Sequence, residues 1–482
     1  MNSHSPLIRR LPGAPPGGVV ARLRGRGETA NVLRAAGLIG LLTIGVKVAG
    51  MGRDVVLASE FGTGDAVEAF LAAWAIPQFL AGITGSAFAG VAIPLQARAQ
   101  ARGGEAESGR FLSELLLISV AAMAVLTALM VPARGLLLPL ATSSFSPEKL
   151  ALTERLWLIM LPGLFLYALI LLWQAVLNTR RRFGLAALSP VVVPAATIGA
   201  LLLFPGAGIE APAVGFVVGM ALQGGLLLEG MRRAGMVVWP RWHGGLAETR
   251  TAVGEFAPYL ANGTLFGGLG VVDQAMAATL GSGSLATLSY GNKLVLPILG
   301  ISSSALATAV YPQFARMVAE EQWRELRDAA RRYTTLILAA TVPATVAVVV
   351  LSPWIVRLVF ERGAFNASDS DAVASVQAMY ALIIPMYTVA HLLSRVINAM
   401  SATKYMAIGS AFIFAFNVGA DYLFKGWLGI EGIALATVFN FGLSLALNVW
   451  LLRRLLAAQI AAQGQAQGEA KSAAAGRRAG AA

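Results

Sequence analysis

Residues 41–61 read LLTIGVKVAGMGRDVVLASEF, an apolar run that contains Lys47, Arg53 and Asp54 within eight positions. A charged side chain at bilayer depth costs several kcal/mol, roughly 3 on insertion scales, so it usually faces a cavity or a partner. The turn-like sequence FGTG follows at residues 61–64, and then a second apolar segment that contains Pro77 and Pro94. The three charges therefore mark the first place to look for a function.

The composition is typical of an integral membrane protein. Of the 482 residues, 57% are apolar and 13% are charged, about half the charged share of a soluble protein. The apolar residues fall into runs long enough to cross a hydrocarbon core of about 30 Å as helices. Helices also satisfy the backbone polar groups within each segment, as lipid requires. We therefore predict an all-α, polytopic membrane protein.

The arginines support a count of about twelve spans. If the N-terminus is inside, the inside loops are rich in arginine, whereas the outside loops hold little beyond Arg134, Arg357, Arg362 and Lys425. This is the positive-inside pattern, and it explains the net charge of +12 without a nucleic-acid partner. We therefore predict that both termini are cytoplasmic. The predicted spans are 33–59, 66–97, 111–132, 152–178, 185–204, 211–231, 251–280, 286–315, 333–351, 372–399, 403–424 and 430–452.

An internal repeat divides the chain into two halves. FGTG at residues 61–64 recurs as LGSG at 280–283, Pro77 recurs as Pro297, and IPLQAR at 93–98 recurs as YPQFAR at 311–316. Six spans separate the copies, so both halves enter the membrane in the same direction, as in transporters built from parallel repeats. We predict six-helix lobes at residues 33–231 and 251–456, joined by a cytoplasmic linker at 232–250. A disordered basic tail at 1–32 and a disordered tail at 457–482 are expected to flank them.

The repeat also relates charged residues in the two halves. Asp273 in the seventh span corresponds to the region of Arg53 and Asp54 in the first. Lys293 lies in the eighth span, which matches the second, where Glu68 lies. Two lobes that face each other across a cleft would bring these side chains together, and the cationic ones could receive a phosphate. The predicted cavity residues are Lys47, Arg53, Asp54, Glu68, Asp273 and Lys293.

Structural roles compete with these assignments. They are a buried Arg53–Asp54 ion pair, Lys47 reaching toward the headgroups, Lys293 neutralising Asp273, and Glu68 at the outer end of its helix. Asp273 lies well inside an apolar run, so we interpret it as a proton or cation site. His391 and Arg395 share a helix face in the tenth span, where a hydrogen-bonded histidine is favoured over a proton relay.

Enzyme chemistry has no support in the sequence. There is no Gly-x-x-x-x-Gly-Lys-Ser/Thr phosphate loop, no histidine cluster with metal spacing and no cysteine. We therefore predict no catalytic residue, no metal site and no cofactor.

Residues 33–455 resemble the MviN/MurJ branch of the multidrug/oligosaccharidyl-lipid/polysaccharide exporters. The resemblance rests on Lys47-x5-Arg53-Asp54, on Phe61-Gly-x-Gly-x3-Glu68-Ala-Phe-x6-Pro77, on Tyr290-Gly-Asn-Lys293-Leu and on Ala307-Thr-x3-Pro312. It implies a flippase of the bacterial inner membrane that moves undecaprenyl-diphosphate-linked sugars, such as lipid II, to the outer leaflet.

The charge pattern and the resemblance together lead us to assign roles to the cavity residues. Lys47, Arg53 and Lys293 would bind the diphosphate. Asp54, Glu68 and Asp273 would balance charge or carry a coupling ion, H⁺ or Na⁺. The implied partners are the polyprenyl-diphosphate-linked glycan and the membrane lipids.

Two departures from the family pattern affect the expected substrate. Ala81-Gly82 stands where the family has an Arg-Arg pair, and twelve spans are predicted where fourteen are usual. Lysine at positions 47 and 293, in place of arginine, also loses the bidentate fork for a diphosphate. An exopolysaccharide or O-antigen-type repeat unit is therefore an alternative cargo. A cation-coupled multidrug exporter on the same scaffold is a second alternative, but such an exporter is expected to have an acidic, aromatic cavity.

Overall fold

The structure is a computed structural model that describes residues 40, 42–180, 183–236, 239–400 and 403–479. Within these residues the regular structure is helical, apart from one β-bridge between Arg362 and Phe365. The predicted N-terminal tail at 1–32 lies outside the described residues, as do the beginning of the first predicted span, Arg181 and Arg182.

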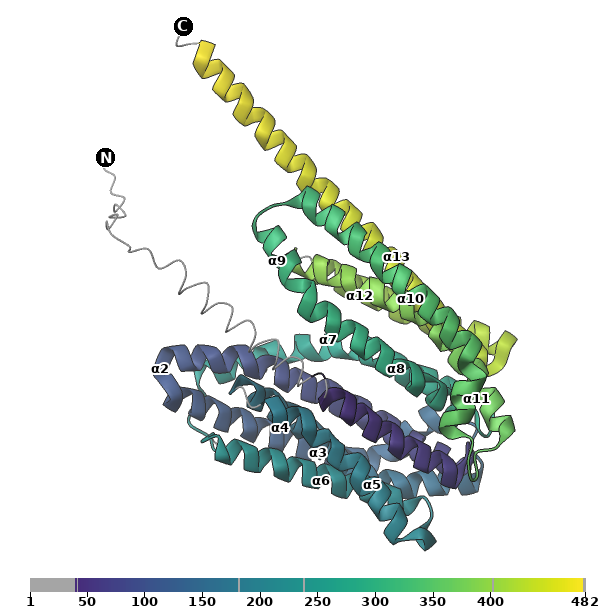
Figure 1. The fold of residues 1–482 in the computed structure, drawn as a ribbon. Coiled ribbons are helices and arrows are strands. Elements are labelled where there is room, and N and C mark those ends of the chain that lie inside the picture. The colour runs from purple at the N-terminus through teal and green to yellow at the C-terminus, as the bar shows by residue number, and fades with distance from the viewer. Residues whose placement is uncertain (1–39, 41, 181–182, 237–238, 401–402, 480–482) are drawn as a thin grey trace, which may run out of the picture.

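The first lobe makes six crossings. It consists of a helix over residues 42–61, α2 (Asp65–Thr142), α3 (Pro147–Thr179), α4 (Phe183–Leu188), α5 (Val192–Leu203) and α6 (Glu210–Arg233). The helix α2 contains two predicted spans, because the chain reverses at Gly103 and Gly104, where Gly104 has a φ of 68°. Figure 1 shows its two arms joined at this reversal. A short 3₁₀ turn (Ser189–Val191) links α4 to α5, so these two helices form a single crossing.

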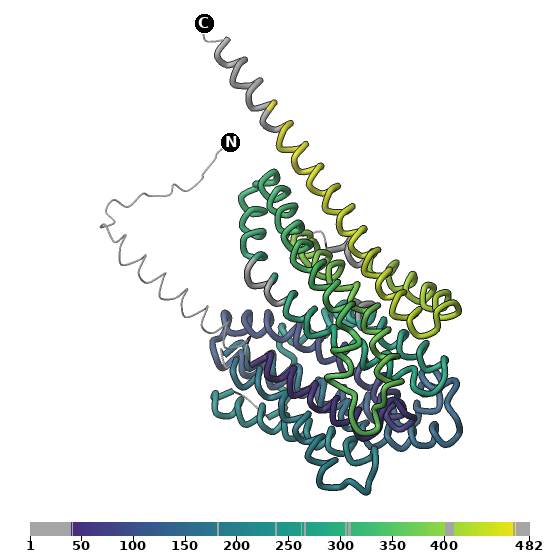
Figure 2. The backbone as a smooth tube through the Cα atoms, turned by 45° about the vertical axis from the view of Figure 1, so that its right-hand side comes forward, coloured from purple at the N-terminus to yellow at the C-terminus, as the bar shows by residue number. Residues whose placement is uncertain are grey.

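The second lobe repeats this plan. It consists of α7 (Ala247–Ala278), α8 (Ser284–Ala309), α9 (Tyr311–Ala319), α10 (Trp323–Phe360), α11 (Ala367–Ala381), α12 (Ile383–Ala399) and α13 (Thr403–Ala479). The helices α11 and α12 form one crossing, and α13 reverses at Gly429, where φ is 62°. The described residues therefore make twelve crossings in two sets of six, which confirms the predicted architecture (Figures 1 and 2).

The C-terminal segment differs from its prediction. Residues 457–482 were predicted to be a disordered tail, whereas α13 continues as a helix to Ala479. The reason is local, because Ala, Gln, Glu, Lys and Arg are strong helix formers and no proline interrupts residues 457–479. Figure 1 shows the C-terminal end of α13 projecting away from the lobe.

The largest cluster of buried apolar side chains fills the first lobe and continues into the second, where it includes Tyr290, Phe360 and Phe365. Trp157 and Phe111 are fully buried in the first lobe, between α3 and the second arm of α2. The second lobe has one cluster around Phe314 and another around Val376.

A buried carboxylate fixes the linker between the lobes to α2. Glu114 Oε1 accepts hydrogen bonds from the backbone N–H groups of His243 (2.8 Å) and Gly245 (2.9 Å). Glu114 Oε2 accepts from the N–H of Leu246 (3.0 Å) and from the hydroxyl of Thr249 (2.6 Å). The linker therefore belongs structurally to the first lobe. Glu114 was not singled out in the sequence.

The turns gather at two ends of the molecule, as the span count requires. At the end predicted to be cytoplasmic, Arg180 pairs with Glu105 at 2.6 Å and joins two neighbouring turns. At the opposite end, the N–H of Ala364 in the second lobe donates to the carbonyl of Ser59 in the first, at 2.7 Å. The second contact joins the two lobes, so it bears on access to the space between them.

Candidate functional site

A cavity of about 630 Å³ lies between the two lobes. The first lobe contributes walls from the helix over residues 42–61, α2, α3 and α6, and the second contributes α7 and α8. The volume falls within the range of about 300–1,000 Å³ that is usual for small-ligand sites. Five of the six predicted cavity residues line it, namely Lys47, Arg53, Asp54, Asp273 and Lys293.

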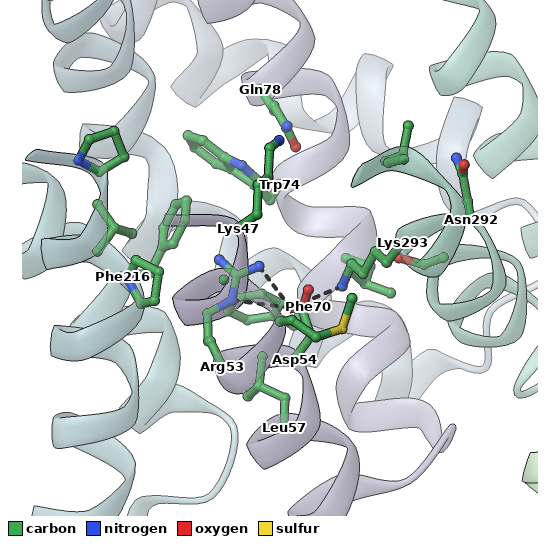
Figure 3. A pocket seen from close by; sticks show the side chains of 18 of the residues that line it. Lys47, Arg53, Asp54, Leu57, Phe70, Trp74, Gln78, Phe216, Asn292 and Lys293 are labelled. Carbon is green, nitrogen blue, oxygen red and sulfur yellow. Dashed lines mark hydrogen bonds and ion pairs between the residues drawn. The ribbon is translucent and has the colours of Figure 1, made fainter. Parts of the chain in front are cut away.

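Asp54 is the meeting point of cations from both lobes. Arg53 donates to Asp54 Oδ1 through Nη2 at 2.7 Å and through Nε at 3.1 Å. Lys293 of α8 reaches the same oxygen from the other lobe, with its Nζ at 3.1 Å. Figure 3 shows Arg53 and Lys293 on opposite sides of Asp54. One carboxylate of the first lobe therefore holds a cation from each lobe.

The two cations keep donors for a ligand. Their side chains are 21% and 22% exposed, whereas that of Asp54 is 8% exposed. Arginine has five N–H donors and lysine has three, so each cation keeps N–H groups that do not bond to Asp54. Lys47 lines the same cavity and forms no ion pair with any described residue. With three cations and two carboxylates, the cavity favours an anionic ligand.

Lys293 does not neutralise Asp273, contrary to one of the alternatives from the sequence. It pairs with Asp54, and its Nζ also lies 5.1 Å from the ring centroid of Tyr290. The structure therefore places the lysine of α8 in the cationic group of the cavity, and it leaves Asp273 to a different set of neighbours.

Glu68 is the predicted residue that does not line the cavity. It is fully buried, and its Oε1 accepts from the N–H groups of Leu285 (2.6 Å) and Ala286 (3.3 Å) at the beginning of α8. Its other oxygen pairs with Lys149 of α3. A carboxylate at a helix N-terminus is stabilised by the unpaired N–H groups and by the helix dipole. Glu68 therefore connects the two lobes at the end predicted to be outside.

Further polar contacts support this outer connection. Lys149 also pairs with Asp65 at 2.8 Å, and Ser282 of the second lobe donates to Asp65 at 2.6 Å. The hydrogen bond from Lys149, and to a lesser extent the one from Ser282, lowers the pKa of Asp65 below its ordinary value. Thr63 donates to Asp369 of α11 at 2.6 Å.

Two glycines allow the backbones of the lobes to approach at the same end. Gly62 has a φ of 59°, and a Cβ on it would lie 2.8 Å from the carbonyl oxygen of Ala364. Gly363 has a φ of 58°, and a Cβ there would lie 2.2 Å from the carbonyl oxygen of Ser59. A larger residue is excluded at both positions by conformation and by space. The outer end of the cavity is therefore closed by backbone contact.

Toward the other end, α7 packs against the first arm of α2. The rings of Phe88 and Phe256 lie 4.6 Å apart, and a Cβ on Gly90 would lie 2.6 Å from the ring of Tyr259. These contacts are apolar, and one ion pair joins the same helices, between Arg102 of α2 and the buried Glu248 of α7 at 2.8 Å. The contacts at the outer end are largely ionic and hydrogen-bonded. The two ends thus differ in what must be broken to open them.

Asp273 belongs to a buried polar cluster inside the second lobe. Thr437 Oγ1 lies 3.2 Å from Asp273 Oδ2, and the side chains of Asn417 and Asp421 approach Asp273 as well. Asn417 and Asp421 are both 0% exposed, and no described residue hydrogen-bonds their side-chain polar atoms. Lys425 lies one turn from Asp421 and donates instead to Thr279 at 3.0 Å.

Such a cluster suits a small cation or a shared proton. Two carboxylates, an amide and a hydroxyl supply oxygen atoms, which hard cations prefer. Adjacent buried carboxylates cannot both remain charged without a cation or a proton between them. Among the described residues, no group of three His, Cys, Asp or Glu is assembled that would hold a metal ion.

Two partners of the predicted residues, Lys149 and Asp421, were not identified from the sequence. Lys149 was placed in a loop before the fourth span, and Asp421 lies near the end of the eleventh. The signal for Asp421 was available, because a carboxylate within an apolar segment is rare. Lys149 carried no such signal, since its partner Glu68 lies 81 positions away.

A family model described as "Lipid II flippase MurJ" matches residues 57–472. The probable lipid II flippase of Synechocystis is 28% identical over 451 residues, covering 89% of this chain and 82% of that protein. The lipid II flippase of Thermosipho africanus is 25% identical over 411 residues, covering 84% and 83%.

Solved structures share the fold. A lipid II flippase in an inward closed conformation superposes with a TM-score of 0.74 at 24% identity, over 86% of this chain and 87% of that one. An inward-facing multidrug transporter of the MATE family superposes with a TM-score of 0.70 at 14% identity, over 87% and 98%. Both flippases and drug exporters therefore use this architecture, and the chemistry of the cavity must separate them.

Proposed function

The chain belongs to the MurJ family of lipid II flippases, and from that membership we propose that it moves a polyprenyl-diphosphate-linked glycan across the bacterial inner membrane. Lipid II is the first candidate for the cargo. The relatives of this chain are transporters rather than enzymes. The observation that carries the proposal is the meeting of Arg53 and Lys293, one from each lobe, on a single oxygen of Asp54.

The diphosphate is proposed to compete with Asp54 for these cations. Without a ligand, Asp54 balances one positive charge from each lobe. A diphosphate has more acceptor oxygens than a carboxylate, and charge-assisted hydrogen bonds from Arg53, Lys293 and Lys47 would draw the lobes around it. Binding of the headgroup would therefore change the contact between the lobes, which is what alternating access requires.

Closure of the outer end supports loading from the cytoplasmic side. The contacts made by Glu68, Gly62 and Gly363 shut that end, so a headgroup would enter where α7 meets α2. Opening the outer end would then release it. An inside-negative membrane potential favours outward movement of an anionic headgroup by roughly 2.3 kcal/mol per charge per 100 mV. Nucleotide hydrolysis is unnecessary for this step.

We propose the cluster around Asp273 as the coupling site, for a proton or a sodium ion. It joins α7 to both arms of α13, so an ion bound there would fix the arrangement of the second lobe. The arginine distribution supports a further proposal, that both termini are cytoplasmic.

The cavity charges weigh against one of the other two candidate functions and leave the second open. A drug exporter for cations would have to accept three cationic side chains in its cavity, which repel such a ligand. An exopolysaccharide repeat unit on the same carrier would use the same diphosphate chemistry, so the cavity charges do not separate it from lipid II.

Rescue of a bacterial host separates the two glycans. The essential lipid II flippase is depleted while this chain is expressed, and its level in the membrane is measured. We expect growth, loss of growth with Arg53→Ala, and growth with Arg134→Ala, an arginine outside the cavity whose guanidinium donates to the carbonyl of Val131. Lysis at a normal membrane level would refute lipid II as the cargo. Full rescue by Arg53→Ala would refute the role of the cavity.

A further inference from the structure

A second cavity, of about 920 Å³, lies inside the second lobe and shares no lining residue with the central one. It is enclosed by α12 and the two arms of α13, with Leu269 of α7 contributing. Most of its walls are apolar, for example Ile413 and Leu447. Its size again falls in the range of about 300–1,000 Å³ for ligand sites. The proposed function makes no use of it.

The described residues that line this crevice carry positive charge. Arg395 lines it, and none of the described residues that line it is a carboxylate. Its Nη2 lies 3.3 Å from His391 Nε2, and the same ring nitrogen lies 2.7 Å from the hydroxyl oxygen of Ser303. Because a guanidinium can only donate, His391 Nε2 is the acceptor. Arg395 forms no ion pair within the described chain, so its remaining N–H groups can donate hydrogen bonds to an anion.

The crevice opens beside aromatic side chains that are exposed on the lobe. Phe412 and Trp450 line it and are 57% and 51% exposed. The guanidinium of Arg454 lies 4.5 Å from the ring centroid of Trp450. Tryptophan and arginine in this arrangement are typical of the level of the lipid headgroups. The arginine distribution assigns this end of the lobe, where α12 ends, to the cytoplasmic leaflet.

We propose that the crevice binds an anionic glycerophospholipid of the inner leaflet, with its phosphate on Arg395 and one acyl chain along Phe412, Ile413 and Leu447. Charge complementarity supports this occupant, because the ligand must pair an anion with a long apolar group. Basic pockets between transmembrane helices on the cytoplasmic side bind anionic headgroups in this way. The lipid is bound between α12 and α13 and is not transported.

The test measures lipid binding to the purified full-length protein in detergent. Phosphatidylglycerol, phosphatidylcholine and undecaprenyl phosphate are titrated separately, and native mass spectrometry counts the bound lipid. We expect phosphatidylglycerol to bind in preference to phosphatidylcholine. Arg395→Gln should weaken phosphatidylglycerol about tenfold, since hydrogen bonds to charged groups are the strong ones.

A second variant fills the crevice and leaves the arginine in place. Gly409 lines it, and a Cβ there would meet no atom within 4 Å, so Gly409→Phe should also reduce binding of phosphatidylglycerol. Arg332→Gln, at an exposed arginine of α10, is the matched control and should bind as the wild type does. Arg53→Ala should also retain this binding, which separates the crevice from the proposed flippase cavity.

Three results would overturn the proposal. They are equal binding of phosphatidylglycerol and phosphatidylcholine, unchanged phosphatidylglycerol binding in Arg395→Gln, and a loss in that variant of undecaprenyl phosphate alone. The last result would identify the occupant as the carrier lipid.

Discussion

Replacing Glu68 by Gln should loosen the outer contact between the lobes. Glu68 of the first lobe accepts two backbone N–H groups of the second, from Leu285 at 2.6 Å and Ala286 at 3.3 Å. Glutamine keeps the size and one acceptor oxygen but removes the negative charge. Lys149 retains Asp65 as a partner at 2.8 Å, so the variant does not leave a buried cation alone.

The magnitude follows from the change of acceptor. A hydrogen bond to a charged group contributes roughly 1.5–3 kcal/mol, and a neutral one roughly 0.5–1.5 kcal/mol. The bond from Leu285 is short and should lose most, whereas the bond from Ala286 is long and should lose little. We expect the closed state to lose about 2 kcal/mol relative to the outward-open state, which is roughly a 30-fold shift in their ratio.

Thiol labelling measures this shift, because the chain has no cysteine. Ser289 of α8 lines the cavity, so Ser289→Cys introduces a single reporter. In right-side-out vesicles, an impermeant maleimide should label it slowly in the wild-type background and many times faster with Glu68→Gln. Glu148→Gln, an exposed carboxylate beside Lys149, is the matched control. Unchanged labelling at a normal membrane level would refute the proposed closure.

Three further changes test other parts of the structure. Asp273→Asn or Asp421→Asn should abolish the dependence of vesicle transport on a proton or sodium gradient, and persistence of that dependence would exclude the cluster as the coupling site. Glu114→Gln should weaken the binding of the linker to α2 by about 2 kcal/mol and so increase proteolysis at residues 239–246. Cleavage at the wild-type rate would contradict this. Gly363→Ala should open the outer end to maleimide because its Cβ would lie 2.2 Å from a carbonyl oxygen of the other lobe. Gly235 has a similar φ of 68°, but a Cβ there would meet no atom within 4 Å, so Gly235→Ala should have a milder effect. Equal effects of the two substitutions would show that the backbone conformation, and not the contact between the lobes, causes the change.

The contrast between the two ends of the cavity suggests how access is divided. The outer end is held by charges, hydrogen bonds and close backbone contact, all of which need defined geometry. Toward the inner end, one ion pair joins Arg102 of α2 to Glu248 of α7 at 2.8 Å. Phe256, Phe88 and Tyr259 supply apolar packing between the same helices. Packing of this kind tolerates small displacements better than a network of buried charges.

The sequence determined the class of fold and the cationic centre. Segment length and hydrophobicity depend only on local composition, so the helices and their turns were predictable, and the repeat fixed the two lobes. Arg53 and Asp54 could be selected because an ionisable residue in lipid needs a partner wherever it lies. The C-terminal tail was missed because its polarity was given more weight than its helix propensity.

Only the tertiary structure decided which residues are partners. One alternative made Lys293 the partner of Asp273, but Lys293 pairs with Asp54. Glu68 was expected in the cavity but lies at the outer contact with Lys149. A sequence records that a buried charge needs compensation, but many distant side chains could supply it. The choice depends on how twelve helices pack, and their packing is set by contacts between residues far apart in the chain.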